Sequence, residues 1–208
     1  MGKRAKSQKD DRFQRAAAVF RQHGWMMRTV EALRAGIHPD TLYSMRDAGR
    51  LDKLARGLYR LAGAPPLRDP DLVTVALKVP RGVICLISAL AFHDLTTQIP
   101  HEVHLALATG MTQPRLGHPP TRVFRFTGKS FTEGVEAHEL DGVPVRVYSP
   151  EKTLADCFKF RNKIGLDTAI EALRFYRERR KADVASLMRH AATCRVEKVM
   201  RPYLEALL

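Results

Sequence analysis

The chain has 208 residues, a formal net charge of +13 and three cysteines. A chain of this length can bury a full hydrophobic core in one or two domains. The odd number of cysteines argues against a secreted disulfide framework, and no Cys/His spacing indicates a zinc site. We therefore expect Cys85, Cys157 and Cys194 to be reduced core residues.

The N-terminal residues are charged, and the longest apolar run, residues 83–92, has about half the length of a membrane span. We expect no cleaved secretion signal, no membrane partner and a cytoplasmic location. Residues 1–10 are polar and rich in lysine and arginine, which predicts a disordered arm.

The positive charge is concentrated near the N-terminus. Residues 1–68 hold 15 Lys or Arg against 6 Asp or Glu, whereas the remaining residues hold 20 against 16. Such an uneven distribution is typical of a protein that binds duplex DNA. The alternative is a basic protein whose charged surface is merely solvated.

Residues 28–49, RTVEALRAGIHPDTLYSMRDAG, predict a helix-turn-helix after a covering helix that begins at Asp11. Ala32 allows close approach of the two helices, and Gly36 permits a sharp turn between them. Pro39 suits the first position of the second helix. The positions expected to be buried are Val30, Ala35, Ile37, Leu42 and Met45.

The second helix of this pair should enter the DNA major groove. Burial of Leu42 and Met45 would turn Asp40, Tyr43, Ser44 and Asp47 outward. An outward aspartate repels phosphate unless it accepts a hydrogen bond from cytosine or orients an arginine. We therefore expect most of the affinity for DNA to come from the basic residues of the helix pair and the hairpin, including Arg34. The predicted DNA-binding residues are Arg28, Thr41, Tyr43, Ser44, Arg46, Arg50, Lys53, Arg56 and Arg60.

Residues 51–61 predict a β-hairpin that follows the helix pair directly, as the wing does in a winged helix-turn-helix. Arg56, beside Gly57, would project at its tip towards an adjacent minor groove or a phosphate. The alternative is a solvated hairpin residue with no partner.

The stretch 62–71, rich in proline, predicts a boundary between domains at 1–67 and 68–208. Beyond it the pattern predicts helices over 72–79 and 83–95, strands near 101–109 and 122–126, and a hairpin turning at Asp141-Gly142. Helices over 149–161, from Asp167, over 183–192 and near 196–207 complete the chain. The predicted fold class is α+β: an N-terminal winged helix-turn-helix, then a mixed α/β C-terminal domain with a small antiparallel sheet.

The C-terminal domain offers no catalytic constellation. Glu151 and Lys152 are adjacent, which does not fit a nuclease acid-x-Lys strand, and no glycine-rich phosphate loop is present. His101 and His104 would point to opposite faces of a strand. We predict no catalytic residue, no metal and no cofactor. The alternative from another class is a nucleic-acid-processing enzyme with a basic substrate-binding head.

Several segments together resemble the AbiEi family of antitoxins and transcriptional regulators from type IV toxin–antitoxin systems. They are ALRAGIHPDTLYSMRDAGRL from Ala32, RGLYRL from Arg56, SALAFHDLT from Ser88 and YSPEKTLADCFKFRNKIG from Tyr148. The resemblance extends over about residues 12–205. Two positions depart from it: Lys152 stands where arginine is common, and Asp94 where glycine is frequent.

The resemblance implies a repressor that binds inverted repeats in double-stranded DNA upstream of its own operon. Cooperative assembly on that DNA is left open. It also implies a C-terminal domain that counteracts a nucleotidyltransferase-like toxin, by contact or indirectly. An orphan regulator without a toxin is the second alternative. The residues assigned to antitoxin function are Ser88, His93, Lys152, Thr153 and Asp156.

The same residues also allow a structural interpretation. Thr153 and Asp156 could organise the start of a helix, with Lys152 paired to an acid. The basic residues of the later helices would form a solvated face, or would bind a partner or RNA. They are Arg161, Lys163, Arg174, Arg177, Arg179, Arg180 and Lys181.

Overall fold

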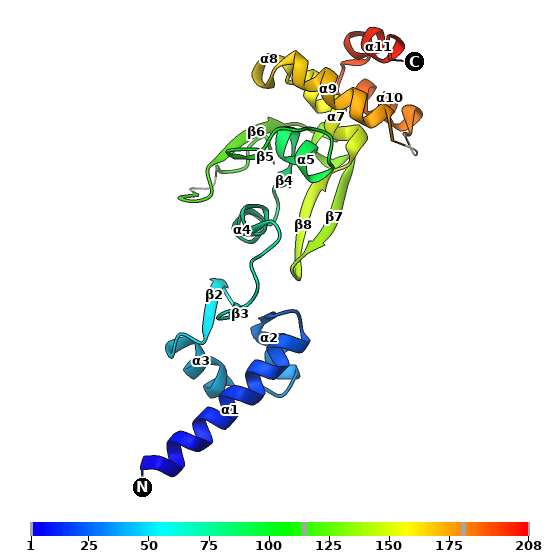
Figure 1. Cartoon of the computed structure of the whole chain (residues 1–208). Helices are drawn as coiled ribbons and strands as arrows, with labels where there is room; N and C mark the ends of the chain where they lie inside the picture. Colours follow the sequence, from blue (N-terminus) through cyan, green and yellow to red (C-terminus); the bar gives the residue numbers. More distant parts are fainter. Residues whose placement is uncertain (1, 114–115, 180–181, 208) are drawn as a thin grey trace. The chain divides into compact units, whose positions relative to one another are not determined.

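The computed structural model describes residues 2–113, 116–179 and 182–207 (Figure 1). The chain divides into two compact units, Met1–Leu77 with Glu139–Val143, and Lys78–His138 with Pro144–Leu208. We call them the N-terminal unit and the C-terminal unit. The domain boundary after residue 67 stays a prediction from the sequence.

The N-terminal unit combines helices with a small antiparallel sheet. Its elements are α1 (Gly2–Gln22), β1 (Met26–Arg28), α2 (Thr29–Arg34), α3 (Pro39–Asp47), β2 (Leu51–Ala55) and β3 (Leu58–Leu61). Within the described residues β3 is the central strand, with β1 and β2 antiparallel on either side. The predicted helix pair and hairpin are both present, and β1 is an additional strand before α2.

The core of the N-terminal unit lies between α1, the helix pair and the sheet. Leu42 and Met45 on α3 are fully buried, together with Phe20 of α1 and Ala32 of α2. Val30 was predicted to be buried and is 57% exposed. Two residues along a helix correspond to about 200° of rotation, so Val30 faces away once Ala32 faces inward.

Glycine forms the turn between α2 and α3. Gly36 has φ = 87°, and the amides of Gly36 and Ile37 donate to Leu33 O and Ala32 O at 3.1 and 2.9 Å. This is the Schellman arrangement, in which a left-handed residue ends a helix. The predicted sharp turn at Gly36 is present.

The start of the chain differs from the expectation. Residues 1–10 were predicted to be disordered and the first helix to begin at Asp11, yet α1 begins at Gly2. Lysine, arginine, alanine and glutamine all favour a helix once a folded helix follows them. Composition alone therefore gave too late a start for this helix.

The C-terminal unit surrounds a sheet with helices. α4 (Pro70–Lys78) belongs to the N-terminal unit up to Leu77, as does the turn between β7 and β8. The elements of the C-terminal unit are β4 (Val83–Ile84), α5 (Leu86–Phe92), β5 (Val103–Ala108), β6 (Thr121–Phe126), α6 (Lys129–Thr132), β7 (Val135–Leu140), β8 (Val143–Tyr148), α7 (Pro150–Lys159), α8 (Arg161–Ile164), α9 (Leu166–Arg177), α10 (Val184–Thr193) and α11 (Glu197–Glu205). Among the described residues the strand order is β6-β5-β4-β8-β7. The predicted α+β class is confirmed.

Two details of the C-terminal prediction are wrong. Residues 83–95 do not form one helix, because Val83 and Ile84 pair with β5 and β8 before α5 begins. The five-stranded sheet is also not purely antiparallel, since β4–β8 and β5–β6 are parallel pairs. A short apolar run cannot be assigned to strand or helix from its periodicity.

Candidate nucleic-acid interface and a buried polar cluster

The N-terminal end of α3 is capped and partly exposed. His38 Nδ1 accepts from the amide of Asp40 at 3.2 Å, and Pro39 occupies the first turn. Asp40, Tyr43 and Asp47 are exposed, while Thr41, Ser44 and Arg46 are half-buried. α3 therefore exposes Asp40, Tyr43 and Asp47 as the sequence predicted, whereas Ser44 is exposed only in part.

Arg46 is held by its neighbours on α3. Its Nε donates to Asp47 Oδ1 at 2.8 Å, and its guanidinium lies 5.2 Å from the centre of the Tyr43 ring. The hydrogen bond that Arg46 donates to Asp47 raises the pKa of Arg46 above its usual value. Asp47 thus orients an arginine, which is one of the two roles expected for an outward aspartate on this helix.

Four other cations of the N-terminal unit have no carboxylate partner for their side chains. Arg28, Arg50, Lys53 and Arg56 are exposed, and none of them has an ion pair within the described part of the chain. Arg60 differs, because its guanidinium donates to the carbonyl of Pro65. Unpaired, solvated guanidinium groups are the ones available to a phosphate.

Arg28 and Arg56 lie at the same end of the three-stranded sheet. In the register of the strands Arg28 stands opposite Leu58, and Arg56 precedes Leu58 by two residues in the hairpin turn. The turn is fastened to the start of α2: the amide of Thr29 donates to Gly57 O at 2.8 Å. The Thr29 hydroxyl donates to the same oxygen at 3.3 Å. We call this end, with Arg28 and Arg56, the hairpin tip.

In the C-terminal unit, Ser88 connects α5 to the sheet. Its hydroxyl accepts from the amide of His104 at 2.9 Å and donates to Glu102 O at 3.3 Å, and only 3% of the residue is exposed. His93 Nε2 donates to the carbonyl of Tyr148 at 2.7 Å, and burial lowers the pKa of His93. Both side chains thus form hydrogen bonds with the backbone of other segments of the fold.

Lys152 and Asp156 form a fully buried ion pair one turn apart on α7. Lys152 Nζ lies 2.6 and 2.5 Å from the two carboxylate oxygens, and both side chains are 0% exposed. Cys194 Sγ donates to Asp156 Oδ1 at 3.2 Å. Burial is the main cause of the raised pKa of Asp156, and Lys152 opposes it. The ammonium group also lies 4.3 Å from the centre of the Tyr148 ring.

The five candidate antitoxin residues are thus only partly brought together. His93 and Thr153 both donate to the Tyr148 carbonyl, at 2.7 and 3.2 Å, next to the Lys152–Asp156 pair. Ser88 lies near the start of α5 and forms its hydrogen bonds with Glu102 and His104 instead. Only His93 is partly exposed, so the other four offer no surface to a partner in this conformation.

The sequence did not reveal two residues that complete the buried cluster. Gly134 has φ = +70°, and a Cβ atom there would lie 2.6 Å from Lys152 Cβ, so only glycine fits against the lysine stem. Cys194 reaches Asp156 from α10. Neither contact has a local sequence signal, because each joins segments distant in the chain.

The later basic residues are not uniformly exposed. Lys163 and Arg174 are exposed, whereas Arg161, Arg177 and Arg179 are half-buried. Arg180 and Lys181 lie outside the described residues. In the described part of the chain no group of three or more His, Cys, Asp or Glu side chains is arranged to hold a metal ion. No helix there is long and apolar enough to cross a membrane.

Comparison with known proteins gives the class of the N-terminal unit. Residues 14–62 match the family model AbiEi_4, described as a transcriptional regulator, AbiEi antitoxin. The resemblance to this family is confirmed over these residues, which contain the helix pair and the hairpin. The match stops before the C-terminal unit.

A solved structure extends the likeness in fold. The crystal structure of the RV2827C protein from Mycobacterium tuberculosis is similar over 91% of this chain and 79% of that chain, with a TM-score of 0.51. The two sequences are 12% identical, so the comparison shows a shared fold and no more. No curated protein matches the chain.

Proposed function

We propose that the protein is a DNA-binding transcriptional regulator that represses its own operon and serves as the antitoxin of a toxin–antitoxin pair. Residues 26–61 would form a winged helix-turn-helix, with β2 and β3 as the wing. The observation that carries this proposal is the AbiEi match at residues 14–62 together with the unpaired Arg28 and Arg56 at the hairpin tip.

In this proposal α3 lies in the major groove. Thr41, Tyr43 and Ser44 face the bases and phosphates near its N-terminal end, and Arg46 is oriented by Asp47. Arg28 and Arg56 contact phosphates or the adjacent minor groove from the hairpin tip. Arg50, Lys53 and Arg60 supply weaker electrostatic attraction from the flanks.

The antitoxin role is proposed for the C-terminal unit. The partner would be a nucleotidyltransferase-like toxin, and the toxin would carry the chemistry, so this chain would act without catalysis in the cytoplasm. Ser88, Lys152, Thr153 and Asp156 are buried, which supports an indirect role in which they shape the surface that counteracts the toxin. His93 is the candidate closest to solvent.

The DNA-binding proposal is tested by fluorescence anisotropy on the protein's own upstream region at several salt concentrations. The logarithm of the binding constant should fall by about 0.9 per phosphate contact for each unit of log salt. Arg28→Gln with Arg56→Gln should weaken binding by about 1–3 kcal/mol and reduce that slope. Arg189→Gln, an exposed arginine of the C-terminal unit, is the matched control.

A flat salt response, or equal losses for Arg28→Gln/Arg56→Gln and Arg189→Gln, would contradict this mechanism. The antitoxin role is tested by co-expression with the protein encoded next to this chain. The arginine double variant should still rescue growth, because the two roles lie in different units. An adjacent gene that is not toxic would favour the orphan regulator instead.

A further inference from the structure

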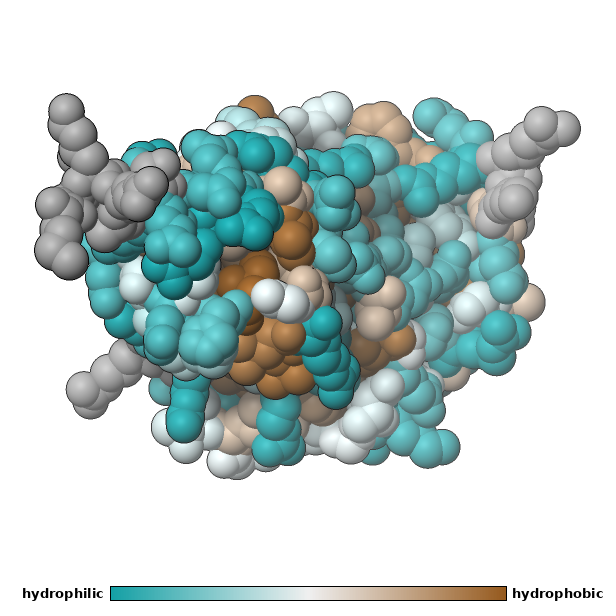
Figure 2. Space-filling model, turned by 90° about the horizontal axis from the view of Figure 1, so that it is seen from below, coloured by the Kyte–Doolittle hydropathy of each residue, from teal (hydrophilic) through white to brown (hydrophobic). Residues whose placement is uncertain are grey.

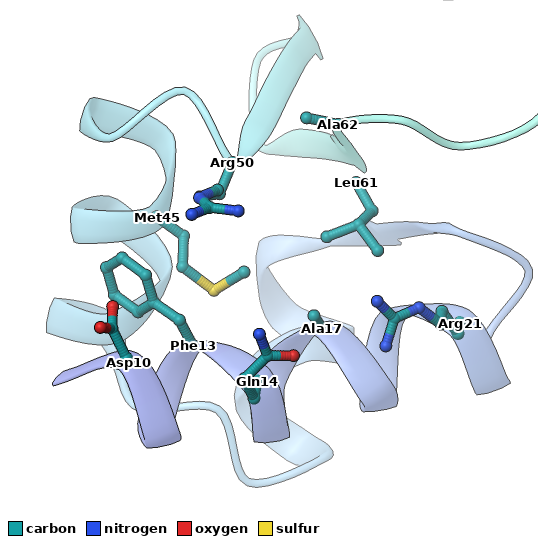
Figure 3. Close-up of a pocket in the computed structure, with 9 residues that line it drawn as sticks. All are labelled: Asp10, Phe13, Gln14, Ala17, Arg21, Met45, Arg50, Leu61 and Ala62. Carbon is teal, nitrogen blue, oxygen red and sulfur yellow. The ribbon is translucent and has the colours of Figure 1, made fainter. Parts of the chain in front are cut away.

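A groove opens on the N-terminal unit between α1, the end of α3 and β3 (Figure 3). Its volume is about 320 Å³, which lies in the range of small-molecule sites. The residues lining it are Asp10, Phe13, Gln14, Ala17, Arg21, Met45, Arg50, Leu61 and Ala62. All of them belong to the N-terminal unit, so the groove does not depend on how the units are arranged.

The floor of the groove is apolar and firmly packed. Ala17, Met45 and Leu61 are buried members of the N-terminal core, and Phe13 packs against that core at the edge. Their backbones belong to α1, α3 and β3, so the floor is part of the folded framework. Little of Met45 and Leu61 is exposed, so the half-buried Phe13 would supply most of the apolar contact for a ligand.

Two arginines face the groove from opposite elements (Figure 3). Arg50 follows α3 and Arg21 lies on α1, and neither has a carboxylate partner within the described residues. Arg21 has instead an aromatic neighbour, with its guanidinium 5.9 Å from the centre of the Trp25 ring. The side-chain amide of Gln14 lies on the α1 side of the same space.

The backbone of Arg50 is fixed on both sides. Its amide donates to Met45 O at 2.8 Å, and its carbonyl accepts from Ala62 at 3.0 Å. Gly49, with φ = 65°, provides the left-handed residue that ends α3 just before it. The Arg50 side chain therefore starts from a rigid point beside the apolar floor.

Asp10 lies at the other end of the groove, beside Phe13. A carboxylate there disfavours a second anionic group on the ligand. The groove thus has two cationic side chains from different elements, an apolar floor and one acidic edge. This arrangement suits a ligand with a single anionic head and an apolar body.

We propose that this groove binds a small monocarboxylate with an apolar body, such as an arylalkanoate. Its carboxylate pairs with the guanidinium groups of Arg21 and Arg50, and its apolar part packs on Phe13 above the buried floor. Guanidinium groups suit this role because they bind carboxylates through two parallel hydrogen bonds. Binding here makes Arg50 unavailable to DNA, so the ligand would also lower operator affinity.

The test is isothermal titration calorimetry of the full chain with 4-phenylbutyrate. We expect a dissociation constant on the order of 1 mM or tighter, as a ligand of this size gives. The neutral amide, 4-phenylbutyramide, should bind at least tenfold more weakly, and so should acetate. The fluorescence of Trp25, the single tryptophan, should change in step because Arg21 leaves its ring.

Variants separate the two halves of the site. Arg50→Gln and Arg21→Gln should each lower the affinity about tenfold, and Ala17→Leu should abolish binding by filling the floor. Arg15→Gln is the matched control, since Arg15 lies on the same helix, pairs with Asp11 and does not line the groove. Circular dichroism of each variant checks that the fold is retained.

The proposal is overturned if 4-phenylbutyrate does not bind, or if the amide binds as well as the acid. It is equally overturned if Arg21→Gln and Arg50→Gln leave the affinity unchanged. Absence of ligand binding combined with loss of operator affinity in Arg21→Gln would assign the groove to DNA instead. The ligand titrations contain no DNA, and only the measurement of operator affinity does. Failure of the ligand site is therefore distinguishable from failure of the proposed regulator.

Discussion

The candidate charged side chains of the two units differ in solvent exposure and in pairing. In the N-terminal unit Arg28 and Arg56 are exposed and have no ion pair among the described residues. Seen from below, one face of the molecule shows hydrophilic residues around a hydrophobic patch (Figure 2). In the C-terminal unit Lys152 and Asp156 are completely enclosed and paired with each other. Both sets were candidate site residues in the sequence. Their exposure distinguishes them: the two arginines are accessible to a partner, whereas the buried pair interacts only within the fold.

This contrast has a physical basis in solvation. An exposed arginine keeps its hydration and can exchange water for a phosphate at little cost. A buried ion pair has already lost its water, and its attraction only offsets that loss when the partner is present. Charged side chains are therefore available to a partner in one unit, whereas in the other they are paired with each other inside the fold.

The largest expected effect comes from breaking the buried pair. Asp156→Ala should lower the free energy of unfolding by about 3–5 kcal/mol, because it leaves Lys152 buried without a counter-charge. Urea denaturation followed by circular dichroism measures it. The double variant Lys152→Met/Asp156→Leu should recover most of the loss. A loss below about 1 kcal/mol in the single variant would mean that water reaches the pair.

A moderate effect is expected from acidification. Burial lowers the pKa of His93, His104 and His190 below 6.5, so the folded protein favours their neutral forms. Below pH 6.5 the unfolded chain takes up these protons first, and stability falls as the pH drops towards the lowered values. Asp156, with its raised pKa, acts in the opposite direction.

For this reason the histidine effect is measured as a difference. Denaturation midpoints of the wild type and His93→Asn are compared between pH 7.5 and pH 5.5, a range that spans the usual histidine pKa of about 6.5. The variant should lose less stability across this range than the wild type. Parallel pH profiles would show that His93 titrates alike in both states.

A smaller effect is expected from releasing Arg46 on α3. Asp47→Ala removes the carboxylate that orients it and also one negative charge. Binding to unrelated DNA should tighten by about 1 kcal/mol or less, while discrimination in favour of the operator decreases. Competition with unrelated duplex DNA measures both. Unchanged discrimination would show that Arg46 does not contact bases.

The smallest effect concerns a turn that lacks glycine. Asp94 has φ = 53° after α5, where the amide of Leu95 donates to Leu90 O at 2.8 Å, as in the glycine turns of the N-terminal unit. Asp94→Gly should therefore stabilise the protein by about 0.5 kcal/mol. Gly49→Asp is the opposite change and should destabilise it. Thermal unfolding of both variants tests the pair.

Asp94 is one of the two departures from the family resemblance seen in the sequence. It occupies a left-handed conformation that usually belongs to glycine and that aspartate tolerates better than most side chains. The departure thus leaves the backbone of α5 intact. The position of His93, one residue earlier, is set by that turn.

Local features of the fold were predictable, and long-range ones were not. The buried positions of Leu42 and Met45, the turn at Gly36 and the outward face of α3 follow from helical spacing, which the sequence displays directly. The three-residue strand β1 and the two-residue strand β4 are too short to produce a periodic pattern. The burial of Lys152 depends on Gly134 and Cys194, whose proximity only the fold creates.

The fastening of Thr29 to Gly57 bears on how quickly a partner can be recognised. Two hydrogen bonds to a single carbonyl hold the turn between β2 and β3 against the start of α2. The backbone segments that carry Arg28 and Arg56 are consequently fixed to each other. Binding of a nucleic acid by both side chains would need no change in the backbone between them. Association would then be governed by diffusion and charge rather than by a conformational search.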